Sequence, residues 1–135
     1  MSEKTILIID DSEDDILLTK RVLMKIGRTI KTDTALSGDA GLALLRRGAV
    51  LPSLILLDLK MPKLDGIEVL RKIRDDERLR SIPVVIITHS DLESDREASY
   101  KAGANSFLPK SVDIDLFQKD LGHILNEWMD GSEGI

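Results

Sequence analysis

The chain has 135 residues, of which 42% are hydrophobic and 32% are charged, and this composition is typical of one soluble globular domain. It contains no cysteine, which excludes disulfides, thiolate metal sites and thiol nucleophiles. Its formal net charge of -5 argues against a large nucleic-acid interface, because such an interface requires a basic face.

Short apolar runs of strand length alternate with amphipathic stretches of helical period. In chain order, we expect strand Thr5–Ile9, helix Glu13–Ile26, strand Ile30–Ala35, helix Gly38–Arg47, strand Leu54–Leu59, helix Gly66–Leu79, strand Val84–Thr88, helix Asp91–Ala102, strand Ser106–Leu108 and a last helix with the apolar stripe Ile114, Phe117, Leu121, Ile124 and Trp128. The first, third and fourth strands are apolar almost without a break, which is typical of burial on both faces. Five strands alternating with five helices predict parallel βαβ units and a three-layer α/β sandwich.

The terminal segments indicate a cytoplasmic protein of one domain. The first apolar run, Ile6–Ile9, is too short for a signal sequence or a membrane span, so we expect no membrane partner. We expect one domain over residues 1–129 and a flexible tail over residues 130–135, with no output domain.

Polar side chains stand where four of the predicted strands end. Asp10 and Asp11 follow the first strand, Asp58 lies at the end of the third, Thr88 ends the fourth and Lys110 follows the fifth. Ligands of an open parallel sheet bind at the carboxyl ends of its strands, so we expect these side chains to converge. Carboxylates that are buried together need a neutralising partner, and Mg²⁺ prefers carboxylate oxygens. Asp11 and Asp58 are the predicted direct ligands, and Asp10 is expected to act through a water.

The same arrangement predicts phosphoryl chemistry. Asp58 is the candidate nucleophile toward a phosphoryl group, and the metal and Lys110 would offset charge on the phosphoryl oxygens. Thr88 can donate a hydrogen bond to one of those oxygens.

Each of these residues also has an ordinary structural interpretation. Asp10 and Asp11 could belong to the cap of the following helix, and the other three could be a turn residue, a β-branched strand residue and a surface lysine. Glu13, Asp14 and Asp15 are interpreted as solvated charges in the first turn of that helix, not as ligands. The occurrence of suitable residues at four separate strand ends favours the functional interpretation.

The longest motif, Leu56-Leu57-Asp58-Leu59-Lys60-Met61-Pro62-Lys63-Leu64-Asp65-Gly66, resembles the receiver domains of two-component response regulators. The segments 8–12, 83–88 and 103–110 resemble further motifs of that family in the same order, and the similarity extends from about Lys4 to Trp128. The resemblance implies a flavodoxin-like fold with parallel strands in the order 2-1-3-4-5. The charged segment Arg74–Pro83 is similar to the phytochrome-associated subgroup of single-domain receivers.

The resemblance also implies a signalling function instead of an enzymatic one. Asp58 would accept a phosphoryl group from a sensor histidine kinase or a phosphotransfer protein in a Mg²⁺-dependent reaction. Asp10, Asp11 and Asp58 would form the acidic metal pocket, with the main-chain carbonyl of Lys60 as a further ligand. Lys110 occupies the position of the family's lysine.

Thr88 and Phe107 match the hydroxyl and aromatic positions of the family's conformational switch. The resemblance implies that the Phe107 ring turns inward when the hydroxyl moves toward the phosphoryl group. The face made by the fourth helix, fifth strand and fifth helix would then change its binding, either to a downstream protein or to a second copy of the chain. We expect Asp91–Lys101 and Ser111–Asp115 to line that face.

Three residues near the strand ends bear on the reactivity of the site. Two occupy positions that tune dephosphorylation in receivers, and the third differs from the residue type that is common in the family. Lys60 and Ser90 lie two positions beyond Asp58 and Thr88, where receivers tune dephosphorylation. Neither side chain orients an attacking water well, so the resemblance implies a persistent phosphoryl group. His89 stands where small residues are common, and we expect a partly exposed neutral imidazole that narrows access to the site.

Other functions of a related fold fit the sequence less well. An aspartyl-nucleophile phosphohydrolase would have a second acid two residues after Asp58, where this chain has Lys60. A nucleotide or flavin carrier would need phosphate-binding backbone amides after the first strand, but the segment Asp10–Asp15 has five acids among six residues. A degenerate receiver that serves only as a scaffold would lack some of the phosphotransfer residues, and all of them are present.

Overall fold

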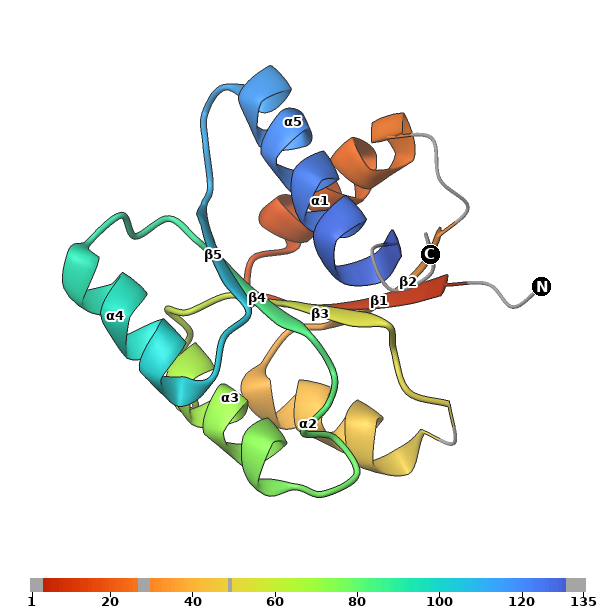
Figure 1. Cartoon of the computed structure of the whole chain (residues 1–135), viewed down its shortest axis with the longest axis vertical. Coiled ribbons are helices and arrows are strands. Elements are labelled where there is room, and N and C mark those ends of the chain that lie inside the picture. Colours follow the sequence, from red (N-terminus) through yellow and green to blue (C-terminus); the bar gives the residue numbers. More distant parts are fainter. Residues whose placement is uncertain (1–3, 27–29, 49, 131–135) are drawn as a thin grey trace.

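Five parallel strands form one sheet in the order β2-β1-β3-β4-β5 in the computed structural model, which describes residues 4–26, 30–48 and 50–130 (Figure 1). The strands are β1 (Lys4–Ile9), β2 (Ile30–Ala35), β3 (Leu54–Leu57), β4 (Val84–Thr88) and β5 (Ser106–Pro109). The helices are α1 (Glu13–Ile26), α2 (Gly38–Arg47), α3 (Gly66–Asp75), α4 (Glu93–Ala102) and α5 (Ile114–Leu125), which continues into the π-helical turn η1 (Asn126–Asp130). The predicted fold class, strand order and number of strands and long helices are confirmed. Of the predicted tail, residues 131–135 lie outside the described residues.

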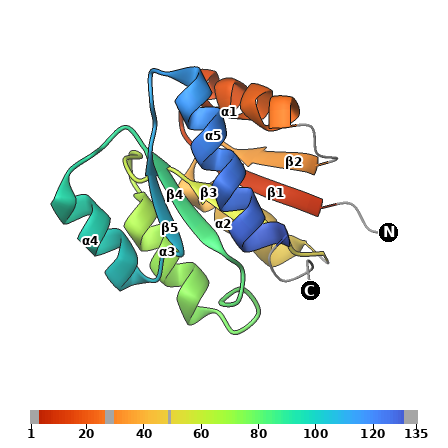
Figure 2. The same ribbon diagram turned by 45° about the horizontal axis from the view of Figure 1, so that its top comes forward.

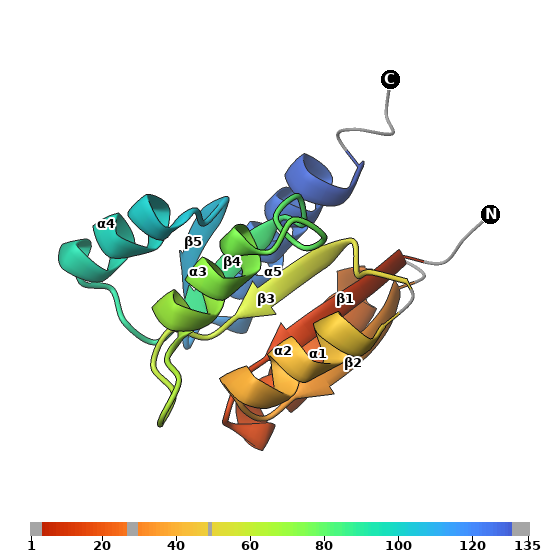
Figure 3. The same ribbon diagram turned by 90° about the horizontal axis from the view of Figure 1, so that it is seen from below.

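The helices cover both faces of the sheet. α1 and α5 lie side by side on one face (Figure 2), and α2 and α3 lie across the other (Figure 3). α4 lies next to α3 and β5, at the outer edge of the sheet. None of the described helices is long and apolar enough to cross a lipid bilayer.

The unbroken apolar strands separate two core layers. In β3, Ile55 and Leu57 belong to the core under α2 and α3, whereas Leu54 and Leu56 belong to the core under α1 and α5. Successive side chains of a strand point to opposite faces, so a strand covered on both sides must be apolar at every position. The prediction that these strands are buried on both faces is confirmed.

Several predicted boundaries differ from the observed ones: α4 begins at Glu93 and not at Asp91, and two elements end before their predicted last residues. The predicted helix Gly66–Leu79 ends at Asp75, because the Asp76 amide bonds to the carbonyl of Ile73 and the chain then turns. Leu79 is nevertheless buried, as a core residue of that turn. The predicted strand Leu54–Leu59 ends at Leu57, which leaves Asp58 and Leu59 in the loop after it.

The buried face of the last helix also differs from the predicted stripe. Its buried side chains are Phe117, Leu121, Leu125 and Met129. Ile114, the predicted start of the stripe, is exposed. A spacing of four residues continues through η1, where a wider helical turn keeps Met129 against the core.

Arg74 connects three segments at the amino-terminal side of β4 and β5. Its guanidinium donates to the carbonyls of Gly103 (3.0 Å), Arg80 (3.0 Å) and Ile82 (2.9 Å), and to Asn105 Oδ1 (2.9 Å). Asn105 Oδ1 also accepts the amide of Val84, the first residue of β4. Burial lowers the pKa of Arg74 from its usual value. From the sequence, Arg74 was noted only as the start of the charged segment Arg74–Pro83, and these contacts were not predicted.

Candidate metal and phosphoacceptor site

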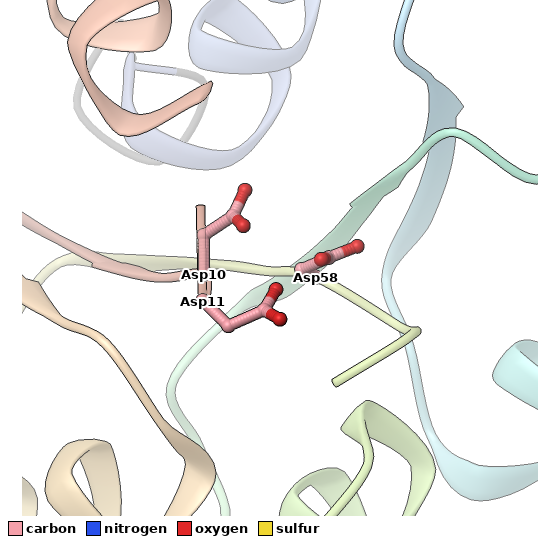
Figure 4. Close-up of side chains that lie close together, drawn as sticks. All are labelled: Asp10, Asp11 and Asp58. Atoms are coloured by element: carbon pink, nitrogen blue, oxygen red, sulfur yellow. The ribbon is translucent and has the colours of Figure 1, made fainter. Parts of the chain in front are cut away.

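The carboxyl ends of β1 and β3 bring Asp10, Asp11 and Asp58 together. β3 pairs with β1 so that Leu57 lies beside Ile9, and the Asp58 amide donates to the Ile9 carbonyl at 2.9 Å. The next residues of the two strands therefore leave the sheet at the same point. One carboxylate oxygen from each of the three lies within 4.8 Å of the others (Figure 4). Asp10 and Asp58 are buried, whereas Asp11 is exposed.

Lys110 is the cation that faces these carboxylates. Its Nζ atom lies 2.7 Å from Asp10 Oδ2 and 2.8 Å from Asp15 Oδ2, but 3.9 Å from Asp58 Oδ1. Burial alone would lower the pKa of Lys110, but the hydrogen bonds to Asp10 and Asp15 raise it above its usual value. The lysine is therefore charged, and its closest partners are Asp10 and Asp15 instead of Asp58.

Asp58 has the most perturbed carboxyl group of the site. Burial, together with the negative charges of Asp10 and Asp11, raises the pKa of Asp58 to about 6, against the opposing charge of Lys110. A carboxylate in this surrounding needs additional positive charge when it is ionised. Clustered carboxylate oxygens are the donors that hard divalent cations prefer, so the residues present fit such an ion.

Asp65 and Gly66 of the long motif hold the loop between Asp58 and α3 in place. A Cβ atom on Gly66 would lie 2.4 Å from the carbonyl oxygen of Asp58, so only glycine allows the chain to approach the Asp58 backbone this closely. The Gly66 amide donates to the Leu59 carbonyl at 2.9 Å, and Asp65 Oδ1 caps α3 by accepting the Glu68 amide at 3.1 Å. These contacts fix the loop that carries Asp58.

Ser12, the residue after Asp11, is the side chain that caps α1. Ser12 Oγ accepts the Asp15 amide at 3.2 Å at the start of α1. Asp10 Oδ1 accepts the Ser12 amide at 3.0 Å, so Asp10 both shapes this loop and pairs with Lys110. Asp11 takes the exposed position between them.

Asp15 and His89 belong to the site, although the sequence analysis interpreted Asp15 as a solvated charge. That interpretation is wrong, because Asp15 Oδ2 accepts from both Lys110 Nζ and, at 2.9 Å, His89 Nε2. Burial alone would raise the pKa of Asp15, but the hydrogen bonds and charges of Lys110 and His89 hold it below its usual value. The partners are 95 and 74 residues away in sequence, so helical periodicity carried no signal for them.

Thr88 and Phe107 lie on the neighbouring strands β4 and β5. The Thr88 side chain is buried, and its hydroxyl oxygen accepts the Ser90 amide at 3.3 Å. The Phe107 ring is also buried, under the guanidinium of Arg96, whose Cζ lies 5.7 Å from the ring centroid. Phe107 therefore occupies an inward position that α4 covers.

Lys60 and Ser90, the residues two positions beyond Asp58 and Thr88, both contact Asp95 of α4. Lys60 Nζ lies 3.2 Å from Asp95 Oδ2, and the Ser90 hydroxyl donates to the same oxygen. The hydrogen bond from Ser90 and the nearby Lys60 lower the pKa of Asp95. The Lys60 side chain is thus paired with Asp95 of α4 and not with Asp10, Asp11 or Asp58.

A cavity of ≈ 410 Å³ opens over these side chains and is lined by Asp11, Ser12, Asp14, Asp15, Asp58, Lys60, Thr88 and His89. The side chains of Asp10 and Lys110 are buried and do not line this cavity. Another cavity, of ≈ 480 Å³, lies between α1 and α5 and lacks such a carboxylate cluster. The two cavities are similar in volume, but only the one at the strand ends is lined by residues of the carboxylate cluster, so we place the functional site there.

The comparisons with known proteins show the family of the chain. Residues 6–121 match the family model of the response regulator receiver domain. The chain is 35% identical over 128 residues to the probable methanogenesis regulatory protein FilR2 of Methanothrix harundinacea, which covers 92% of this chain and 83% of that protein. It is 39% identical over 137 residues to response regulator Rcp1 of Synechocystis sp., which covers 94% of this chain and 90% of that one.

Solved structures of phytochrome-associated regulators are similar over nearly the whole chain. The phosphorylated cyanobacterial phytochrome response regulator RcpA superimposes with a TM-score of 0.86 at 33% identity, covering 95% of both chains. The Mn²⁺-bound form of Rcp1 superimposes with a TM-score of 0.82 at 36% identity, covering 93% of this chain and 94% of that one. The predicted similarity to phytochrome-associated single-domain regulators is confirmed.

Proposed function

Because the chain belongs to the response regulator receiver domains, we propose that it is a signalling protein in which Asp58 accepts a phosphoryl group from a histidine kinase or a phosphotransfer protein. One observation carries this proposal. Asp58 is buried at the end of β3 with the Asp10 and Asp11 carboxylates and the Lys110 ammonium around it, and it lines an open cavity. A phosphoryl donor can therefore reach a carboxylate that has an ammonium beside it and two further acids able to hold a divalent cation.

The residues of the acidic pocket would hold Mg²⁺. Asp11 and Asp58 are the proposed direct ligands, with the main-chain carbonyl of Lys60 as a third. Both oxygens of Asp10 already accept hydrogen bonds, which supports a contribution through a water. When it is bound, the ion supplies positive charge that offsets the charge of the phosphoryl oxygens.

The chain's own residues perform the transfer. An Asp58 carboxylate oxygen forms a bond to phosphorus while the P–N bond of the donor phosphohistidine breaks, and the leaving imidazole nitrogen keeps the electron pair of that bond. Lys110 pairs with a phosphoryl oxygen, and the Thr88 hydroxyl donates to another. Thr88 has this O–H available because its contact with the Ser90 amide uses the hydroxyl oxygen only as an acceptor.

Phosphorylation would change the binding of a partner protein to the face made by α4, β5 and α5. These three elements follow one another along the outer edge of the sheet (Figure 2). Exposed apolar side chains lie on α4, on α5 and next to them: Leu92, Tyr100, Val112, Ile114 and Leu116. They support a surface for a downstream protein or for a symmetric dimer, and sedimentation with and without beryllofluoride separates these two partners.

The experiment that tests the proposed function is phosphorylation by acetyl phosphate. With Mg²⁺ present, the protein should incorporate one phosphoryl group in a linkage that acid and base both cleave, and the Asp58→Asn variant should incorporate none. Asn keeps the shape of the side chain and removes the nucleophile. Incorporation into Asp58→Asn, or continued turnover of a phosphomonoester such as p-nitrophenyl phosphate, would contradict the proposal.

A further inference from the structure

The Lys110 ammonium has more than one carboxylate partner before any phosphoryl group arrives. An ammonium has three N–H donors, and two of them face Asp10 at 2.7 Å and Asp15 at 2.8 Å. Asp58 Oδ1, at 3.9 Å, lies beyond hydrogen-bond distance. In this resting position the ammonium is hydrogen-bonded to Asp10 and Asp15 and forms only a longer ion pair with Asp58.

Asp15 is well placed to fix that resting position. It is in the first turn of α1, its amide is held by the Ser12 hydroxyl, and its side chain is 23% exposed. Its Oδ2 atom accepts from Lys110 at the end of β5 and from His89 at the end of β4. One carboxylate oxygen thus joins three loops around the cavity, and the acidic metal pocket does not use it.

We propose that Asp15 is a positioning residue that holds the Lys110 ammonium in this resting place and so opposes its transfer to a phosphoryl oxygen on Asp58. This inference rests on the proposed function of Asp58. The buried ammonium needs carboxylate partners as long as the site contains no phosphoryl group, and Asp15 supplies one of them. When a phosphoryl oxygen becomes the negatively charged partner of the ammonium, the hydrogen bond from Lys110 to Asp15 must break or lengthen.

Asp15 therefore stabilises the unphosphorylated form relative to the phosphorylated form. A contact that is present in one of two states and lost in the other shifts the population toward the first. Removal of the Asp15 carboxylate should favour the occupied site. Removal of a carboxylate that does not contact Lys110 should change the preference for the occupied site only through the loss of one negative charge.

Beryllofluoride binding at saturating Mg²⁺ measures this preference directly, because beryllofluoride takes the place of the phosphoryl group on Asp58. We expect Asp15→Asn to bind beryllofluoride about tenfold more tightly than Asp14→Asn, the size expected for one charge-assisted hydrogen bond. Asp14 is the matched control, since it is the exposed neighbour, lines the same cavity and carries the same charge. Asp15→Ser removes the carboxylate with a smaller side chain and should behave like Asp15→Asn.

The affinity for Mg²⁺ alone distinguishes positioning from a charge effect. It should be the same in Asp15→Asn and Asp14→Asn, because both lose one negative charge. Beryllofluoride binding no tighter in Asp15→Asn than in Asp14→Asn would overturn the inference, as would a gain that is matched by a change of similar size in the Mg²⁺ affinity. Failure of the wild-type protein to bind beryllofluoride would instead overturn the proposed function, and this inference with it.

Discussion

Arg96 of α4 covers the ring of Phe107, with 5.7 Å between the guanidinium carbon and the ring centroid, and it lies at the same distance from the ring of Tyr100. Phe107 is therefore connected to an exposed side chain of α4 through a single guanidinium. A displacement of the Phe107 ring would therefore change its contact with Arg96.

This relationship predicts how far a change at Asp58 reaches. With Mg²⁺ and beryllofluoride, the backbone amide resonances of Phe107, Arg96 and Tyr100 should shift along with those around Asp58 in a two-dimensional NMR spectrum. In the Thr88→Val variant, which lacks the hydroxyl but keeps the shape, the shifts should stay near Asp58. Shifts in the wild-type protein that end at the pocket would contradict the switch.

Asp11 should be the most sensitive metal-binding residue. Its exposed carboxylate completes the acidic cluster, whereas Asp10 and Ser12 hold the loop before α1. Asp11→Asn should weaken Mg²⁺ binding by about tenfold or more, since even outer-shell partners of a metal contribute that much. Isothermal titration calorimetry measures this, with Asp14→Asn as the control. Equal affinity in the two variants would make Asp11 an ordinary charge at the start of α1.

The stability of the metal-free protein should depend on the ionisation of Asp58. The pKa of Asp58 is raised to about 6 from the usual 3.8, so the folded state binds this proton more tightly than the unfolded state. Protonation of Asp58 therefore contributes to the free energy of unfolding. This contribution is fully present below the usual pKa of 3.8 and is lost as the pH rises through about 6. Asp58→Asn avoids that loss and should be more stable than the wild type at pH ~8 by on the order of 2 kcal/mol.

Urea unfolding in the presence of EDTA tests this prediction at several pH values. The advantage of Asp58→Asn should shrink as the pH falls below 6 and should be nearly gone at about pH 3, below the usual pKa of 3.8, where Asp58 of the wild type is protonated in both states. Saturating Mg²⁺ should also reduce it, because the ion binds the folded wild type. An advantage that does not change with pH would show that another property of the substitution causes it.

Arg74 should contribute more to stability than any exposed arginine of α3. Arg74→Met keeps much of the apolar stem but removes four hydrogen bonds, three of them to carbonyls. We expect a loss of about 2–3 kcal/mol in the free energy of unfolding, because partly buried acceptors lose their donors. Arg71→Met, an exposed position on the same helix, is the control and should change stability by less than about 0.5 kcal/mol. Equal effects would contradict the role of Arg74 as a connector.

The sequence was sufficient for the sheet and for the carboxylate cluster, because both depend on local patterns. Apolar runs without a break indicate strands buried on both faces, and the acids that end them must meet where the parallel strands end. Leu79 was assigned to a helix because its apolar spacing continues that of α3, and spacing does not distinguish a helix from a turn that packs on the same core. Asp15 and Arg74 were missed because a charged residue in a helix is usually solvated, and only the tertiary structure brings their distant partners to them.

The helix α4 differs from the other long helices in how little of it is buried. Ser99 is its only buried residue among those described, whereas α1, α2 and α3 each bury four and α5 buries three. Elements with few buried contacts open locally at a smaller free energy than the rest of a domain. Amide hydrogens of α4 should therefore exchange with solvent deuterium before those of α1, α3 and α5. A segment that opens so readily can change its conformation at a cost that a single new bond at the site is able to offset.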